Sequence, residues 1–277
     1  MAAMQTHPVA RLWNAAVWIL TLFFLLNVAA MIAMVLLNSF AARWFNSWLP
    51  PSLTVRWYSA AWGEFQLGDL LIVTMEVTLA VVVISALIGI PAAYALARAN
   101  FPGKRLATVL FLLPMMIPPI TYGIPLATVL YQVDLGGTMA GVVIANLVPT
   151  VPFVILVMTP FIEQIDTNLE SAARIFGANT WRMFVHVLVP LLAPGILAAS
   201  LIVMVRTIGM FELTFLTAGP DSQTLVVALY YAAFAPGVRA GQSISAMAVV
   251  YMLLSLAWLL IALRFVNPTQ LVTRVKS

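Results

Sequence analysis

The chain has 277 residues, of which 63% are hydrophobic and 8% are charged, whereas a typical soluble domain carries about 25% charged residues. This composition excludes a soluble globular protein and predicts a polytopic membrane protein. There is no cysteine and there are two distant histidines, so disulfides, thiolate metal sites and histidine-rich metal sites are not expected. The net charge of +4 reflects the placement of lysine and arginine around the bilayer, and no nucleic-acid partner is expected.

A membrane span requires about 20 mainly apolar residues. Six stretches satisfy this, so we predict an all-α fold with six transmembrane helices in a single domain over residues 1–277. The predicted spans are Trp13–Leu37, Leu70–Ala97, Leu106–Tyr131, Met139–Ile162, Leu191–Thr217 and Ser243–Phe265. The first stretch is too long for a signal peptide and is predicted to be retained.

The basic residues gather on one side of these spans. With an even number of spans, the side that holds both termini receives Arg11, Arg98, Lys104, Arg105, Arg174, Arg182, Arg264, Arg274 and Lys276, and the opposite side receives Arg43, Arg56 and Arg239. Positive charge marks the cytoplasmic side of a membrane protein. Both termini and the loop of residues 163–190 are therefore predicted to be cytoplasmic.

The loop of residues 38–69 carries four tryptophans. They are Trp44, Trp48, Trp57 and Trp62. Because the tryptophan ring favours the membrane interface, we interpret the loop as an interfacial helix or belt. The alternative is a platform on which a ligand stacks.

The third and fourth spans contain helix-breaking residues. The third holds Pro114, Pro118, Pro119, Gly123 and Pro125, and the fourth holds Asn146, Pro149, Pro152 and Pro160. Broken helices at membrane depth are tolerated where they are buried in protein or line a wet cavity. The pattern favours a pathway for polar cargo, although prolines are common in spanning helices in any case. In the second span, the sequence ALIGIPAAYALA predicts close helix packing through small residues.

Three ionisable residues lie inside predicted spans and more than a turn from the span ends: Glu76, Arg206 and Glu212. Each costs several kcal/mol in lipid unless it is paired or wet. Ion pairing between helices and contact with cargo both explain them. Together with Tyr122 and Asn146 they are our candidate pathway residues.

A polar segment, EQIDTNLESAARIFGANTWRMFVHVLVP, occupies residues 163–190. It is predicted to form a helix, a turn at Gly177 and a second helix that ends at Pro190. Neither this segment nor the rest of the chain contains a Gly-rich phosphate loop, a GxSxG, an HExxH or a paired-cysteine motif. No catalytic residue and no metal ligand is therefore predicted.

The spacing in this segment follows the pattern E-A-A, three residues, Gly, nine residues, Ile-x-Leu-Pro. The matching residues are Ser171, Ala172, Ala173, Gly177, Val187, Val189 and Pro190. The pattern resembles the EAA loop of permease subunits of binding-protein-dependent ABC importers. Ser171 stands where a glutamate is usual, and Glu170 precedes it, so Glu170 is the candidate for the acidic contact with the ATPase.

Two further stretches resemble subclasses of this family. ALARANFPGKR with the proline-rich span after it, and RTIGMFELTFLTAGPDSQTLVVALYYAAF, resemble carbohydrate-type permeases of the maltose-importer class. The matching positions in the second stretch are Arg206, Glu212, Gly219, Pro220 and Thr224. Residues 39–58 resemble polyamine-type permeases instead. The resemblance implies a pathway for a small polar organic solute, with a carbohydrate favoured and a polyamine as the alternative.

The resemblance also implies partners and a location. A helix around residues 165–176 would dock in a cleft of a cytoplasmic ATPase, and ATP-driven closure would move the spans as rigid bodies. The implied partners are a second permease, two ATP-binding subunits that hold ATP and Mg²⁺, an extracytoplasmic solute-binding protein and membrane lipid. The chain itself would bind no cofactor, hydrolyse no ATP, and lie in the cytoplasmic membrane of a prokaryote.

Three other interpretations compete with this one. The first is an ion-coupled secondary transporter that uses Glu76 and Glu212 as proton carriers, and it predicts inverted repeats in the sequence. The second is a membrane-embedded enzyme, although no clustered nucleophile, base or metal ligand supports this interpretation. The third concerns the loop of residues 163–190, which would rest on lipid as an amphipathic helix instead of docking on an ATPase.

Overall fold

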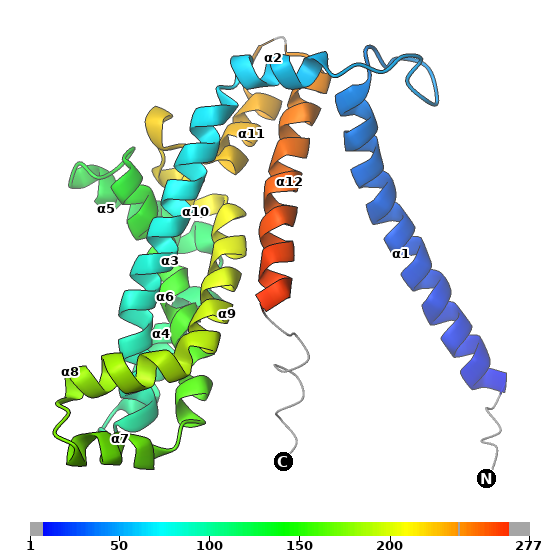
Figure 1. Cartoon of the computed structure of the whole chain (residues 1–277). Coiled ribbons are helices and arrows are strands. Elements are labelled where there is room, and N and C mark those ends of the chain that lie inside the picture. Colours follow the sequence, from blue (N-terminus) through cyan, green and yellow to red (C-terminus); the bar gives the residue numbers. More distant parts are fainter. Residues whose placement is uncertain (1–7, 238, 266–277) are drawn as a thin grey trace. The chain divides into compact units, whose positions relative to one another are not determined.

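The computed structural model describes residues 8–237 and 239–265, with the side chains of residues 8–12 left undescribed. All regular elements in this part of the chain are helices (Figure 1). They form two compact units, one comprising the residues up to Phe65 with Ala235–Val250 and the other Gln66–Phe234 with the residues from Tyr251. The sequence analysis predicted a single domain over residues 1–277, and this stays a prediction.

The membrane-spanning character of the chain is confirmed. Five helices are long and apolar enough to cross a membrane, and a sixth span is obtained if one bent helix pair is counted as one. The five are Trp13–Phe40, Leu67–Arg98, Met139–Glu163, Thr180–Ile208 and Gly241–Phe265. The all-α fold with up to six spans therefore agrees with the sequence-based prediction.

The smaller unit contains α1 (Pro8–Phe40), α2 (Arg56–Glu64) and the first part of α12 (Gly241–Phe265). Its polar contacts join segments distant in sequence: the Asn38 amide donates to the Ser245 hydroxyl at 2.7 Å, and the Trp57 indole donates to the Ala41 carbonyl at 2.7 Å. The predicted helix in the tryptophan-rich loop is present as α2, and Trp48 in the same loop is 98% exposed.

The core of the larger unit lies between α3 (Leu67–Arg98), α6 (Met139–Glu163) and α9 (Val189–Ile208), which run side by side (Figure 1). Fully buried residues such as Val81, Met158 and Leu192 fill it. At Gly89 a β-carbon would lie 2.7 Å from a methyl group of Val154 on α6. The predicted close approach through small residues is thus confirmed, because only a residue without a side chain fits there.

The third span is broken, as its prolines predict. It consists of α4 (Lys104–Met116) and α5 (Pro119–Gln132), which meet at an angle of 97°. Ile117 and Pro118, at the junction, have extended backbone conformations. Two consecutive prolines after Ile117 remove backbone donors and exclude a continuous helix.

The fourth span was expected to be broken in the same way, and this expectation is wrong. α6 continues through Pro149, Pro152 and Pro160. It is the most buried of the span candidates, with 61% of its apolar window inside the structure. Neighbouring helices support a spanning helix in which prolines have removed hydrogen bonds, and this packing explains why α6 persists.

The fifth span differs from the prediction at both ends. The helix starts at Thr180 rather than Leu191 and runs without interruption to Ile208, through α8 (Thr180–Met183), the π-helix η1 (Phe184–Leu188) and α9. Pro190 does not end a helix, because the wide turn of η1 precedes it and the helix continues with the proline near the start of α9. Gly209 then ends α9, so that the short α10 (Glu212–Thr217) is a separate element.

After α10 come the short 3-10 helix η2 (Pro220–Ser222) and the apolar helix α11 (Leu225–Phe234). The Ser222 hydroxyl donates to the Gly137 carbonyl at 2.9 Å, and the Gly137 N–H donates to the Thr217 carbonyl at 2.9 Å. The Leu225 N–H donates to the Thr74 hydroxyl at 2.9 Å. Because Thr74 lies near the start of α3, α11 is attached at the end of α3 opposite to Arg98.

Candidate functional site

The polar loop between the fourth and fifth spans begins with α7 (Thr167–Ile175), which lies across one end of the α3, α6 and α9 bundle (Figure 1). The Asp166 carboxylate accepts a hydrogen bond from the Asn168 N–H at 2.9 Å and so caps the start of the helix. Glu170 in the first turn and Arg174 in the last turn complement the helix dipole. Local chemistry alone therefore favours a helix here, as predicted.

Gly177 ends this helix. Its φ of +85° lies in the left-handed region, where residues with a side chain are strained. The Ala178 N–H donates to the Ala173 carbonyl at 3.0 Å, which closes the wide C-terminal turn that such a glycine makes possible. Asn179 then caps the next helix by accepting from the Arg182 N–H at 2.8 Å. The turn predicted at Gly177 is confirmed.

Of the predicted coupling residues, Ser171 and Ala172 are exposed on α7, and Ala173 is half-buried against the core. The Ser171 hydroxyl donates to the Thr167 carbonyl of its own helix at 3.2 Å. Pro190 lies on the helix that continues into α9, and it is exposed. Ser171 and Ala172 are thus presented outward, together with the Gly177 turn.

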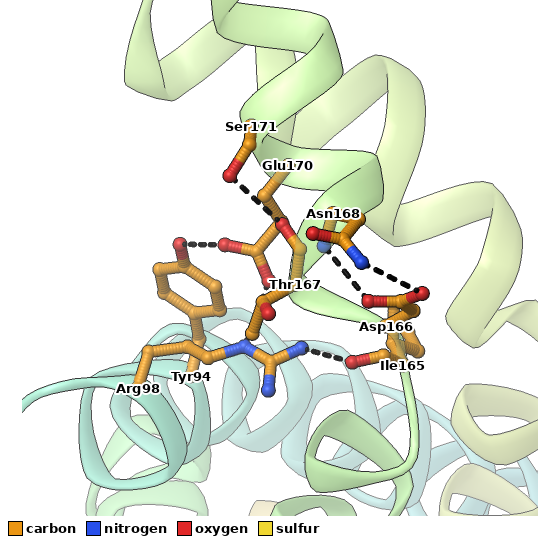
Figure 2. Close-up of polar contacts among 8 residues, drawn as sticks. All are labelled: Tyr94, Arg98, Ile165, Asp166, Thr167, Asn168, Glu170 and Ser171. Carbon is orange, nitrogen blue, oxygen red and sulfur yellow. Dashed lines mark hydrogen bonds and ion pairs between the residues drawn. The ribbon is translucent and has the colours of Figure 1, made fainter.

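Glu170 takes a different direction (Figure 2). It is only 6% exposed, and its carboxylate accepts from the Arg98 guanidinium Nε at 2.7 Å and from the Tyr94 hydroxyl at 2.8 Å. Arg98 also donates through Nη2 to the Ile165 carbonyl at 2.6 Å. The acid that was predicted to contact an ATPase therefore binds the end of α3 in this structure.

Four large apolar side chains of this loop are exposed, and the sequence analysis did not single them out. They are Leu169, Ile175, Phe176 and Trp181, which are 46%, 84%, 90% and 72% exposed. We call these four residues the apolar patch. The signal in the sequence was present, because Ile175 and Phe176 are apolar residues directly before the glycine turn of a polar helix. Exposed apolar side chains on a polar loop mark a protein–protein or membrane interaction site.

The predicted pathway residues Tyr122 and Asn146 lie close to α10. Asn146 is buried, and its amide donates to the Val142 carbonyl at 2.8 Å and to the Thr214 hydroxyl at 3.1 Å. Tyr122 packs against the cluster that contains Leu213, and its hydroxyl is buried without a partner among the described residues. Both residues therefore join α10 to the broken third span and to α6.

The charged pathway residues do not form ion pairs within the described part of the chain. Arg206 is exposed, and its guanidinium carbon lies 4.5 Å from the centre of the Phe153 ring. Glu212 is half-buried at the start of α10. Tyr122 packs against the cluster that contains Leu213, and Leu213 directly follows Glu212 on α10.

No ion pair of the described residues joins Glu76 to Arg206 or Glu212. It is exposed on α3 and has no hydrogen bond or ion pair with the residues that the structure describes. The alternative of ion pairing between helices therefore finds no support among the residues that the structure describes. A carboxylate exposed on a spanning helix favours a wet pathway or a second subunit as its surroundings.

Five aromatic rings form a continuous cluster on α10 and α11 and at the residue before α10. They are Phe211, Phe215, Tyr230, Tyr231 and Phe234, with successive ring centres 5.0–5.9 Å apart. We call this set the aromatic cluster. Tyr230 contacts the other four rings and is 39% exposed. The sequence analysis quoted this stretch without predicting the cluster, because the break at Gly209 that sets the direction of α10 was not predicted.

A family model described as "Binding-protein-dependent transport system inner membrane component" matches residues 85–271. Two curated proteins illustrate the range of relatives. The molybdenum transport system permease protein ModB of Haemophilus influenzae is 33% identical over 186 residues, covering 60% of this chain and 81% of that protein. The trehalose transport system permease protein SugB of Mycobacterium tuberculosis is 32% identical over 157 residues, covering 57% of each chain.

The fold is also similar to solved structures. A chain of a bacterial ABC transporter involved in the import of the acidic polysaccharide alginate superposes with a TM-score of 0.75 at 17% identity, covering 95% of this chain and 99% of that one. A chain of the MetNI methionine ABC transporter superposes with a TM-score of 0.53, covering 73% of this chain and 96% of that one. At these identities the likeness concerns the fold.

Proposed function

We propose that the cargo of this protein is a carbohydrate. The chain belongs to the family of binding-protein-dependent transport system inner membrane components. It is therefore a multi-pass permease of an ABC importer for small solutes. Membership in this family answers the secondary-transporter and enzyme alternatives, because the relatives are permeases of the same kind. Their names include molybdenum and trehalose transport, so the cargo must be argued from the site.

The aromatic cluster is the observation that carries the carbohydrate proposal. Ring faces offer the C–H faces of a sugar a flat apolar surface, and polar side chains nearby bind its hydroxyls. Tyr230 and Phe234 are 39% and 74% exposed, and Glu212 follows Phe211 directly. A partly exposed set of rings next to a carboxylate that has no ion pair among the described residues is the combination that a neutral, hydroxyl-rich solute requires.

An oxyanion is less well suited to these residues. Arg206 is the one cation among the candidate pathway residues, whereas Glu76 and Glu212 are two carboxylates without an ion pair among the described residues. Two carboxylates repel a doubly charged anion in a medium of low dielectric constant. A polyamine is the opposite case, since it would require those carboxylates.

The loop between the fourth and fifth spans suggests the partner subunits of the importer. We propose that α7, the Gly177 turn and the apolar patch dock on an ATP-binding subunit that holds ATP and Mg²⁺ and hydrolyses the nucleotide. Two such subunits, a second permease and an extracytoplasmic solute-binding protein would complete the importer. One neighbouring structure is described as an alginate transporter in complex with a periplasmic protein, which supports partners of this general kind. Both termini are proposed to be cytoplasmic in the prokaryotic inner membrane.

Uptake measurements test the cargo. Cells that produce the complete importer would be compared with cells lacking this chain, using labelled trehalose, putrescine and molybdate as probes. We expect the disaccharide alone to depend on the chain. Tyr230→Leu should lower its uptake by up to about tenfold, because a ring contact contributes about 0.5–1.5 kcal/mol.

Matched variants make this result specific. Tyr230→Phe keeps the ring and should retain uptake, and Phe24→Leu removes an exposed ring of α1 that lies outside the cluster. Replacing both Glu76 and Glu212 with glutamine should weaken disaccharide uptake and would abolish putrescine uptake if the alternative holds. Chain-dependent uptake of putrescine or molybdate without disaccharide uptake would reject the carbohydrate proposal.

A further inference from the structure

We call residues 163–190 the coupling loop. Arg98 binds this loop at two points, one before α7 and one within it. Its Nη2 donates to the Ile165 carbonyl at 2.6 Å, and its Nε donates to Glu170 at 2.7 Å. Ile165 follows the end of α6, and Glu170 lies in the first turn of α7. One guanidinium at the last turn of α3 therefore fixes both the entry to α7 and its first turn (Figure 2).

Tyr94 completes the arrangement one turn earlier on α3. Its hydroxyl donates to the second oxygen of Glu170 at 2.8 Å, and its ring packs edge-on against Phe184 at 5.6 Å between ring centres. Both carboxylate oxygens of Glu170 are thus occupied by α3. We call Tyr94, Arg98 and Glu170 the α3–α7 brace.

The brace is buried enough to be rigid. The side chains of Arg98 and Glu170 are 17% and 8% exposed. Hydrogen bonds between charged groups are shorter and stronger than neutral ones, and removing one partner of a buried pair leaves an uncompensated charge. α7 cannot move away from the end of α3 without breaking these contacts.

We propose that Glu170 is a positioning residue that transmits movement of the coupling loop to α3, rather than a contact to the ATPase. The apolar patch presents the outward contact, and the brace makes α7 and α3 one rigid body. α3 also carries Glu76, 18 residues before Tyr94, so displacement of α7 reaches a candidate pathway residue through one helix. This inference rests on the proposed docking of α7 on an ATP-binding subunit.

A cysteine pair tests the brace, because the chain contains no other cysteine. The complete importer, reconstituted in liposomes with its binding protein, would carry Arg98→Cys together with Glu170→Cys. We expect the reduced double variant to retain its ATP-binding subunit and hydrolyse ATP, while the disaccharide imported per ATP falls by about tenfold or more. A short bifunctional thiol reagent that joins the two cysteines should restore most of the loss.

The controls separate a transmission role from a docking role. Arg174→Cys with Glu170→Cys places the second cysteine on α7 itself, so a cross-link there should restore nothing. Tyr94→Phe keeps the ring and removes the hydroxyl, and should lower import per ATP less than the loss of Arg98. If Glu170→Gln instead releases the ATP-binding subunit during purification, or the Arg98–Glu170 cross-link blocks import, the proposal is overturned.

Phe176→Asp distinguishes failure of this inference from failure of the docking proposal. A charge at this position, which is 90% exposed, should release the ATP-binding subunit if the apolar patch docks on it. Retention of the subunit by Phe176→Asp would count against docking. The cross-linking result would then still report whether α3 and α7 must stay joined for import.

Discussion

Gly177 is important for its backbone rather than for any contact. Its φ is +85°, and no atom lies within 4 Å of the position that a β-carbon would take. Space is therefore available for a side chain, and only the left-handed conformation resists one. A substitution here separates the geometry of the turn from the packing around it.

Replacing Gly177 with valine should impair coupling without preventing membrane insertion. The backbone penalty is about 1–2 kcal/mol, and relief of the strain would change how α7 meets the following helix. We expect solute uptake to fall by about 5- to 30-fold, measured in cells with equal amounts of the protein in the membrane. Gly177→Asn should lose less, since asparagine tolerates this conformation. Equal, normal uptake by both variants would contradict this role of the turn.

Glu170 shows where reasoning from residues reaches its limit. The spacing of Ser171, Ala173 and Gly177 predicted the helix and the turn, because capping and glycine conformations are local properties. The partner of Glu170 is not local: Arg98 precedes it by 72 residues. Nothing in the loop indicates that its acid points toward α3, and the sequence-based assignment of Glu170 to the ATPase contact followed from proximity to the missing motif glutamate.

At the scale of helices, packing decided which proline-rich segment broke. The third and fourth spans both contain several prolines, yet α4 and α5 meet at 97° and α6 is continuous. The difference is that Pro118 and Pro119 are adjacent at the junction, whereas the prolines of α6 are separated and Pro149 and Pro152 are buried among neighbouring helices. Composition predicts that a break is possible, and the tertiary surroundings determine where it occurs.

The contact between α3 and α6 provides a test at this scale. Gly89→Ala would place a β-carbon 2.7 Å from a methyl group of Val154, which is 2% exposed and has no room to move. Overpacking of this kind typically destabilises by about 1–3 kcal/mol, so the thermal unfolding temperature in detergent should fall.

A second substitution should reverse that effect. Gly89→Ala combined with Val154→Ala removes the clash and should recover most of the lost stability. Gly63→Ala in α2, where nothing lies within 4 Å of the added carbon, serves as the matched control and should not lower the unfolding temperature. A Gly89→Ala protein as stable as the parent would show that α3 and α6 do not approach this closely.

At the scale of the whole molecule, the charge distribution and the proposed docking surface predict the same side of the membrane. The basic residues Arg98, Lys104 and Arg182 all lie at the α7 end of the larger unit, and positive charge favours the cytoplasm. The apolar patch lies on that same loop, where an ATP-binding subunit could reach it only from the cytoplasm. Arg274 and Lys276, which entered the same charge count, lie outside the described residues, and the side chain of Arg11 is likewise undescribed.

Orientation is testable because the natural chain is free of cysteine. Lys104→Cys lies at the start of α4 near the α7 end, and Asp221→Cys lies in η2, beyond α10. A maleimide that cannot cross the inner membrane would be added to cells in which that membrane is intact. It should label Asp221→Cys directly, and it should label Lys104→Cys only after the inner membrane has been opened. The cysteine-free parent gives the background. Labelling of Lys104→Cys in intact cells would place the coupling loop outside, where no ATP-binding subunit could dock, and the charge asymmetry would then need another explanation.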